Sequence, residues 1–224
     1  MPRIVGLAYA SKLYRNNKNL SDMENFSING NEVVFGTIGD ASTSEGHFWE
    51  AINACGVLQV PLIMSIWDDG YGISVPSEYH TTRNDLSKAL SGFQRSSKKE
   101  NGYEIFTVHA WDYINLLKTY QKAEKLARED HVPCIIHVKD VTQPQGHTTS
   151  GSHERYKSKE RLNWEKDFCC IKRMREWIIE NNFASNSEID IIEKNAEDIA
   201  KKSRDRSWKS YRDDIKEDFD DAIA

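Results

Sequence analysis

The sequence lacks both a long apolar run and a long basic run. No stretch of its 224 residues approaches the roughly 18 apolar residues that a membrane-spanning helix needs. The start of the chain has no apolar segment of the kind found in signal peptides. The formal net charge is -5 and the pI is near 5.8, so a basic surface for a phosphate backbone is missing. We therefore expect a protein that binds neither membranes nor nucleic acid.

Cysteine is scarce and follows no metal-binding or disulfide pattern. No C-x-x-C spacing occurs, so the sequence indicates neither a zinc site nor a disulfide framework. A reducing, cytoplasmic location is the expectation. The four cysteines are Cys55, Cys134, Cys169 and Cys170.

Apolar runs and helical spacing alternate along the first part of the chain. Hydrophobic residues make up 38% of the sequence, which is enough for one sizeable core and an appendage. The alternation predicts an α/β fold with a mainly parallel sheet flanked by helices. The opening residues 4–14 already have helical spacing with no N-cap before them, so we expect the domain to lack its amino-terminal part. Strands are predicted at 32–38, 61–67, 102–108 and 132–138, and helices at 44–57 and 113–129.

The pattern of apolar and polar residues changes after residue 140. Residues 143–153 are polar, include two glycines and have no periodicity, which predicts a mobile loop. Helical spacing returns at 158–182 and again from 187 to about 214. The predicted organisation is an α/β domain over residues 1–157, including an active-site loop at 140–157, followed by a helical C-terminal extension over 158–224.

Polar residues follow two of the predicted strands directly. Gly39 to Gly46 come after the first strand, and Asp68-Asp69-Gly70 come after the second. Ligands of parallel sheets gather at the carboxyl ends of the strands, where these carboxylates would approach each other. Carboxylate oxygens beside the free amides of a helix N-terminus suit Mg²⁺ and a diphosphate. The same residues also permit simpler structural roles: Ser42-x-x-Glu45 has the form of a capping box, and Asp-Gly is a turn dipeptide.

The stretch GDASTSEGHFWEAINACGVLQVPLIMSIWDDGYGISVP, residues 39–76, resembles a known motif. It is similar to the thiamine diphosphate motif of the alpha chains of 2-oxo acid dehydrogenase complexes, which runs from Gly-Asp-Gly to Asn-Asn. The resemblance extends upstream to residues 4–10 and downstream to Gly146-His147-Thr148 and Tyr156. It covers roughly residues 1–182 and implies the thiamine diphosphate-binding fold.

The resemblance implies a role for each matching residue. Asp40 and Asp69 would bind Mg²⁺ through their side chains, and Tyr71 would bind it through its backbone carbonyl. His147 would be the catalytic loop histidine that faces the diphosphate. Thr148, Ser150 and Ser152 lie where some relatives are phosphorylated, and no phosphorylation is predicted here. The implied cofactor-binding residues are Gly39, Asp40, Ala41, Ser42, Asp69, Tyr71 and His147.

Two positions depart from the family pattern. Ala41 replaces the second glycine, which is acceptable if its φ is negative. Asp68-Asp69 replaces Asn-Asn and adds two negative charges near a diphosphate. The property that this change would alter is the affinity of the site for the metal. Other histidines, such as His80 and His137, are expected to have surface or hydrogen-bonded core roles.

The implied activity is oxidative decarboxylation of a 2-oxo acid, pyruvate or 3-methyl-2-oxobutanoate, with acyl transfer to a lipoyl group. The implied partners are a beta chain or fused beta half and a lipoyl-bearing acyltransferase component. We expect the chain alone to be inactive. Two alternatives stay open. One is a non-catalytic assembly module that keeps the fold. The other is a Mg²⁺-dependent phosphohydrolase built from Asp40, Asp68 and Asp69, which needs a Lys or Ser partner nearby, with Thr43 or Ser44 as candidates.

Overall fold

The computed structural model describes residues 1–147 and 152–223. The chain divides into two compact units, Met1–Arg173 and Met174–Ala224. The first unit contains the whole sheet, and the second consists of helices. The division into functional domains at residue 157 stays a prediction.

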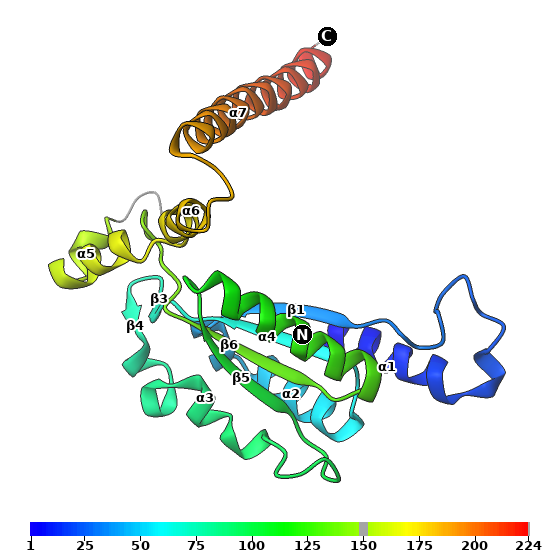
Figure 1. The fold of residues 1–224 in the computed structure, drawn as a ribbon. Coiled ribbons are helices and arrows are strands. Elements are labelled where there is room, and N and C mark those ends of the chain that lie inside the picture. Colours follow the sequence, from blue (N-terminus) through cyan, green and yellow to red (C-terminus); the bar gives the residue numbers. More distant parts are fainter. Residues whose placement is uncertain (148–151, 224) are drawn as a thin grey trace. The chain divides into compact units, whose positions relative to one another are not determined.

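A four-stranded parallel sheet forms the centre of the first unit (Figure 1). Its order is β1-β2-β6-β5, so strands that are far apart in the sequence lie side by side. The runs predicted as strands are confirmed, each with a slightly later start. The strands are β1 (Val34–Gly39), β2 (Leu62–Trp67), β5 (Glu104–His109) and β6 (Cys134–Lys139).

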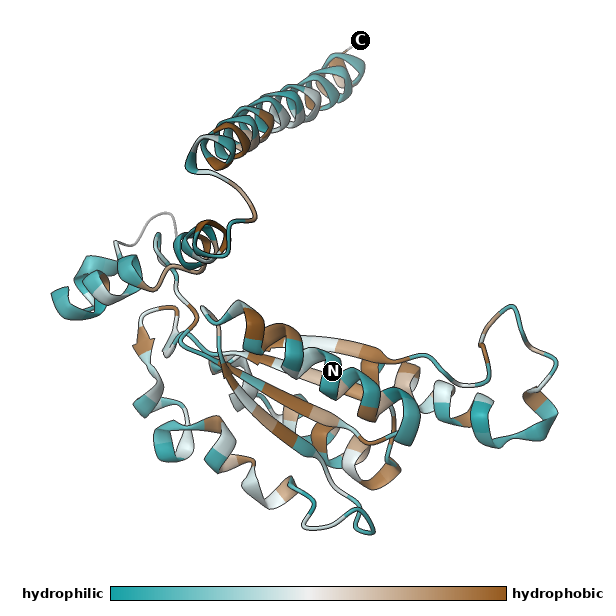
Figure 2. Ribbon diagram, viewed as in Figure 1, coloured by the Kyte–Doolittle hydropathy of each residue, from teal (hydrophilic) through white to brown (hydrophobic). Residues whose placement is uncertain are grey.

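Helices cover both faces of this sheet, which confirms the predicted fold class. The helices α1 (Pro2–Asn16) and α2 (Gly46–Leu58) pack on one face, and α4 (Tyr113–Asp130) packs on the other. Side chains of β2 alternate between the two cores: Met64 packs with α2, and Ile63 packs with α4. Figure 2 shows the apolar residues concentrated on the strands and on the helix faces that cover them. Since β2 is buried on both faces, its carboxyl end has a firm position.

The segment between β2 and β5 contains short elements that the sequence did not predict. They were not predicted because the polar residues of this segment have neither helical nor alternating spacing. Asp85 caps the short helix in this segment, because its side chain accepts a hydrogen bond from the backbone N–H of Lys88. The elements are β3 (Tyr71–Gly72), β4 (Val75–Pro76), η3 (Ser77–Tyr79), η4 (Thr82–Asn84), α3 (Leu86–Ala89) and η5 (Ser91–Phe93).

The helical spacing predicted over residues 158–182 is confirmed, but it is divided between two helices. The chain forms α5 (Lys159–Asp167) and α6 (Cys170–Glu180), with a break at Phe168. The Phe168 ring packs against Trp111 and Trp164, with ring centroids 5.2 and 5.1 Å away. This packing of three aromatic rings accompanies a departure from helical backbone at Phe168, which local periodicity does not reveal. Three further short helices are η1 (Lys18–Leu20), η2 (Ala41–Ser44) and η6 (His153–Arg155).

The last helix, α7 (Asn186–Ile223), extends further than the predicted end near residue 214. Its first turns are linked to α6 by Arg175, whose guanidinium lies 2.6 Å from Asp190 and 2.8 Å from Glu193. Within the described ranges of the chain, no helix is long and apolar enough to cross a membrane.

Candidate metal and diphosphate site

The carboxyl ends of β1 and β2 meet at one edge of the sheet. The two strands are hydrogen-bonded neighbours, with Gly39 opposite Trp67. The backbone N–H of Asp40 donates to the carbonyl of Trp67 at 3.1 Å. Asp40 and the Asp68-Asp69 pair therefore lie beside each other, as the sequence predicted.

A cavity of about 270 Å³ opens at this edge of the sheet. Four of the predicted site residues line it: Gly39, Asp40, Asp69 and His147. The other predicted residues do not line this cavity: Ala41 and Ser42 lie in η2, and Tyr71 lies in β3. The remaining lining residues are Thr37, Ile38, Trp67, Val141 and Gln143.

Asp40 is a buried carboxylic acid at the end of β1. Only 3% of its surface is exposed. Burial raises the pKa of its carboxyl group to about 7, and the negative charges of Asp68 and Asp69 add to this shift. Its Oδ2 atom has no hydrogen-bond partner among the described residues, and Nε2 of His80 lies 3.8 Å away. An unsatisfied buried carboxylate oxygen is unfavourable unless a cation or donor is supplied.

Asp69 presents a second buried carboxylate oxygen to the same cavity. Its Oδ1 atom accepts a hydrogen bond from the backbone N–H of Tyr71 at 3.2 Å. Its Oδ2 atom has no hydrogen-bond partner in the described part of the chain and lies 3.4 Å from Nε2 of His147. Burial raises the pKa of Asp69, and His147 acts in the opposite direction. The free oxygens of Asp40 and Asp69 are hard donors of the type that Mg²⁺ prefers.

These two carboxylates fit a metal site that is completed by its ligand. No group of three or more His, Cys, Asp or Glu side chains suited to a metal occurs among residues 1–147 and 152–223. Mg²⁺ is commonly held by one or two carboxylates together with phosphate oxygens and water. The donor set therefore fits a Mg²⁺-diphosphate pair better than a metal held by protein side chains alone.

The turn after Asp40 begins the short helix η2 without a side-chain capping bond among the described residues. Ala41 begins the short helix η2 and is absent from the residues with positive φ, so its Cβ causes no backbone strain there. The capping-box interpretation is wrong: Glu45 is itself the N-cap of α2, and no side-chain capping bond forms in this described segment. The Thr43 hydroxyl in this turn is already bonded, because its Oγ1 donates to the carbonyl of Asp40 at 2.6 Å.

Asp68 has a different role from Asp69. Its Oδ2 atom lies 2.7 Å from Nε2 of His137, and its Oδ1 atom accepts from the N–H of Gly70 at 2.9 Å. Burial alone would raise the pKa of Asp68, but the hydrogen bond and the charge of His137 outweigh it, so the pKa is lowered. Of the two aspartates, only Asp69 lines the cavity.

The loop after β6 brings His147 to the site. Gly146 precedes it with φ +70°, and a Cβ at Gly146 would lie 3.3 Å from the His153 side chain, so glycine suits this turn. Of the three positions that lie where some relatives are phosphorylated, Ser152 is described by the structure, and its hydroxyl donates to the carboxylate of Glu154. Thr148 and Ser150 lie outside the described residues.

Two basic residues after the loop support Asp69 and Tyr71, and neither was predicted from the sequence. Arg161 Nη2 donates to the backbone carbonyl of Asp69 at 2.9 Å. Lys157 is buried, bonds Glu165 at 2.7 Å, and places its ammonium 4.9 Å from the centre of the Tyr71 ring. A buried lysine cannot be identified from sequence when, as here, it follows a polar loop.

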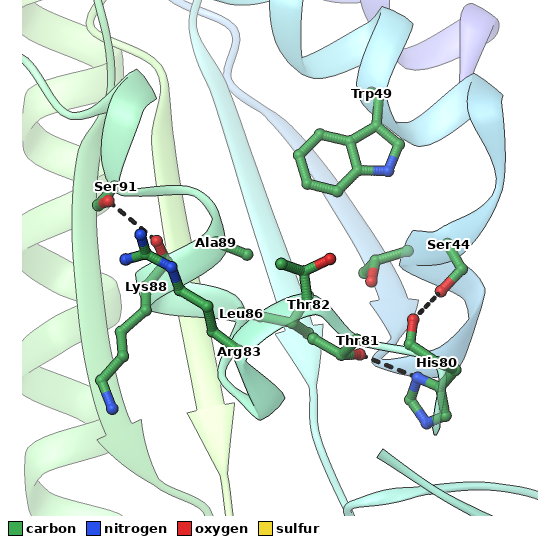
Figure 3. A pocket seen from close by; sticks show the side chains of 11 residues that line it. Ser44, Trp49, His80, Thr81, Thr82, Arg83, Leu86, Lys88, Ala89 and Ser91 are labelled. Atoms are coloured by element: carbon green, nitrogen blue, oxygen red, sulfur yellow. Dashed lines mark hydrogen bonds between the residues drawn. The ribbon is translucent and has the colours of Figure 1, made fainter. Parts of the chain in front are cut away.

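A second cavity, larger than the first, is lined in part by Thr43 and Ser44 of the turn after Asp40. It measures about 500 Å³, and Figure 3 shows Trp49 and Ser44 facing the segment that carries Thr82 and Arg83. Ser44 Oγ donates to the backbone carbonyl of His80 at 2.8 Å. His80, for which a surface or hydrogen-bonded core role was expected, lines this cavity and also lies near Asp40.

Comparison with known proteins identifies the family. A family model described as the dehydrogenase E1 component matches residues 1–214. The chain belongs to this family. It is 27% identical over 173 residues to the pyruvate dehydrogenase E1 component subunit alpha of Rickettsia bellii. It is also 27% identical over 224 residues to the mitochondrial 2-oxoisovalerate dehydrogenase subunit alpha of Dictyostelium discoideum. The resemblance to alpha chains is thereby confirmed.

The E1 relatives are longer than this chain. The matched region covers 77% of the chain and 50% of the Rickettsia protein, and 99% of the chain and 45% of the Dictyostelium protein. The chain thus spans about half the length of these curated relatives. Among solved structures, a transketolase from Campylobacter jejuni matches with a TM-score of 0.44 and 19% identity, over 60% of this chain and 18% of that one.

Proposed function

We propose that this E1-family chain holds the Mg²⁺-diphosphate end of thiamine diphosphate. The observation that carries the proposal is the pair of buried, unpartnered oxygens, Oδ2 of Asp40 and Oδ2 of Asp69, at one cavity among the described residues. A divalent cation would neutralise both carboxylates and bridge them to a diphosphate.

Each site residue has a defined task in this proposal. Asp40 and Asp69 bind the metal through their side chains, and Tyr71 binds it through its backbone carbonyl. Gly39, Ala41 and Ser42 form the turn whose amides face the diphosphate, and such amides at the start of a helical turn favour anions. His147 donates toward the diphosphate or the reacting group from the loop. When bound, the cofactor supplies the ring that accepts electrons during decarboxylation.

The reaction proposed for the complete enzyme is oxidative decarboxylation of a 2-oxo acid with acyl transfer to a lipoyl group. The names of the relatives support pyruvate and 2-oxoisovalerate (3-methyl-2-oxobutanoate) as substrates. The proposed partners are a beta chain or fused beta half, which would complete the cofactor site, and a lipoyl-bearing acyltransferase component. The cytoplasmic location stays a prediction.

A calorimetric titration with Mg²⁺ and thiamine diphosphate tests this proposal. It is carried out on the 224-residue chain alone and together with its beta chain. Saturable binding that needs both Mg²⁺ and the beta chain supports the proposal. Absence of binding in both cases contradicts it and favours a non-catalytic assembly module that keeps the fold.

The phosphohydrolase alternative has its own test. It requires Asp40 as nucleophile and a Lys or Ser partner nearby, whereas the hydroxyls of the candidates Thr43 and Ser44 donate to backbone carbonyls. Incubation with a generic phosphate ester and Mg²⁺ is expected to release no phosphate above a D40N control. Release that D40N abolishes would favour the hydrolase.

A further inference from the structure

A chain of hydrogen bonds runs from Asp68 into the sheet. Asp68 Oδ2 lies 2.7 Å from Nε2 of His137, and Nδ1 of the same ring lies 2.6 Å from Ser87 Oγ. Ser87 Oγ in turn lies 2.9 Å from Oγ1 of Thr107. The residue types are those of a catalytic triad, but the His137 side chain has no exposed surface. No substrate can reach the ring, so this chain of bonds has a structural task.

Asp68 is the first residue of the turn that presents Asp69. Its backbone N–H donates to the carbonyl of Val138 at 2.9 Å, and its carbonyl accepts from Val141 at 3.0 Å. Its side chain accepts from the N–H of Gly70 at 2.9 Å, which closes the turn around Asp69. The Asp68 backbone therefore anchors the chain before Asp69, and the Asp68 carboxylate holds the backbone N–H of Gly70 after it.

An unpaired negative charge on Asp68 would interfere with the binding of a cation and a diphosphate at the site. Its carboxylate is close enough to Asp40 for its charge to affect that group. A third free carboxylate would turn toward a bound cation or repel a diphosphate. His137 is the group that satisfies Asp68 on the side away from the cavity: its ring lies on β6, and Ser87 on α3 fixes the orientation of that ring.

We propose that His137 is a positioning residue for the metal site. By pairing with Asp68, it keeps that carboxylate away from the cation and holds the turn so that Asp69, and not Asp68, faces the cavity beside Asp40. Hydrogen-bond partners of this kind commonly change metal affinity by about 10- to 100-fold. The inference rests on the proposed function and explains how this chain accommodates Asp-Asp at these positions.

Hydrogen exchange in the metal-free 224-residue chain tests the positioning directly. In H137F, the Asp68 carboxylate loses its partner, and the Gly70 amide is expected to exchange at least about tenfold faster. In the double variant H137F/D68N, Gly70 protection is expected to return, because an Asn oxygen accepts the same bond without an unpaired charge. A mere packing role for His137 predicts no rescue. Unchanged exchange in H137F, or a double variant as fast as H137F, overturns the proposal.

The control is His131→Phe, which removes a buried histidine whose Nε2 lies 3.0 Å from the carbonyl of Gly30. It is expected to leave Gly70 exchange unchanged. If H137F does not fold, H137Q replaces it: its amide donates to Asp68, and near-wild-type protection is expected, while loss of protection at Gly70 without global unfolding counts against the proposal.

Metal titration separates this inference from the proposed function. With Mg²⁺ and thiamine diphosphate in the presence of the beta chain, H137F is expected to bind at least about tenfold more weakly than wild type, and H137F/D68N to recover. Equal binding by wild type and H137F refutes the positioning role and leaves the proposed function intact. Absence of binding by wild type refutes the proposed function, while the exchange result still decides whether His137 positions the turn.

Discussion

Nε2 of His147 lies 3.4 Å from Oδ2 of Asp69, although the two residues are 78 positions apart in the sequence. The contact joins the loop after β6 to the end of β2, which is the neighbouring strand in the sheet. It is the parallel order of the strands that brings the loop histidine to the carboxylate. A substitution at either His147 or Asp69 is therefore expected to affect the binding of Mg²⁺ and the diphosphate.

Removing a proposed metal ligand is expected to weaken metal binding without unfolding the chain. D40N and D69N should each lower the affinity for Mg²⁺ with thiamine diphosphate at least about tenfold, or ~1.4 kcal/mol. Asn keeps the size of the side chain and removes its charge. The measurement is calorimetry in the presence of the beta chain.

Asp130→Asn is the matched control for these variants, because Asp130 is exposed at the end of α4. It should bind as wild type does. If D40N and D69N both bind Mg²⁺ with thiamine diphosphate as tightly as wild type does, Asp40 and Asp69 are not metal ligands.

Metal binding should depend on pH around neutrality. Burial raises the pKa of Asp40 to about 7, so below this pH the metal must displace a proton from the carboxyl group. Affinity for Mg²⁺ is therefore expected to rise as the pH increases through 7 and to level off above it. Calorimetry in two buffers of different ionisation enthalpy should show proton release at pH 6.5 and much less at pH 8.5. Equal proton release at both values would contradict the assignment.

Gly72 should be intolerant of a side chain. A Cβ at this position would lie 2.8 Å from Cβ of Ala41, which is held in the turn after β1. G72A is expected to lower the free energy of unfolding by roughly 1–3 kcal/mol, because the two turns must separate. Gly92 is the matched control, since a Cβ there meets no atom within 4 Å. Denaturant unfolding should show G72A as the less stable variant, and equal stability would argue against the close approach.

The carboxylate of Glu32 should stabilise the fold above acidic pH. Burial acts to raise the pKa of Glu32, but hydrogen bonds from Ile28 N–H at 2.7 Å and Ser27 Oγ at 2.8 Å outweigh it, so the pKa is lowered. The stabilisation is fully present above the ordinary pKa of Glu and is lost as the pH falls through the lowered value.

E32Q is therefore expected to lower the free energy of unfolding by about 1 kcal/mol at pH 7 and by less at pH 3. E24Q, at an exposed position, should change it little at either pH. A loss in E32Q that is the same at pH 7 and pH 3 would mean that the charge is not what matters.

The strands and the site edge were predictable because their determinants are local. Four apolar, β-branched runs with helical spacing between them define a parallel sheet, and strand ends in such a sheet converge. This was sufficient to place Asp40 beside Asp69. The resemblance to a known motif was needed for His147, because nothing in a polar loop indicates where it folds back.

The missed features depend on tertiary contacts. Phe168 ends α5 among Trp111 and Trp164, which no helical pattern reveals. His80 lies 3.8 Å from Asp40 because short turns after β4 return the chain to the site. His137 was expected to be a hydrogen-bonded core or surface residue, and its burial and its bond to Asp68 confirm the core role.

The most direct test of the account is a crystal structure of the chain with its beta chain, grown with Mn²⁺ in place of Mg²⁺ and with thiamine diphosphate. The account predicts an anomalous Mn²⁺ peak bound by the side chains of Asp40 and Asp69 and the carbonyl of Tyr71, next to the diphosphate. Asp68 should remain bonded to His137. A diphosphate bound elsewhere, or a well-defined complex with no metal between Asp40 and Asp69, would contradict it.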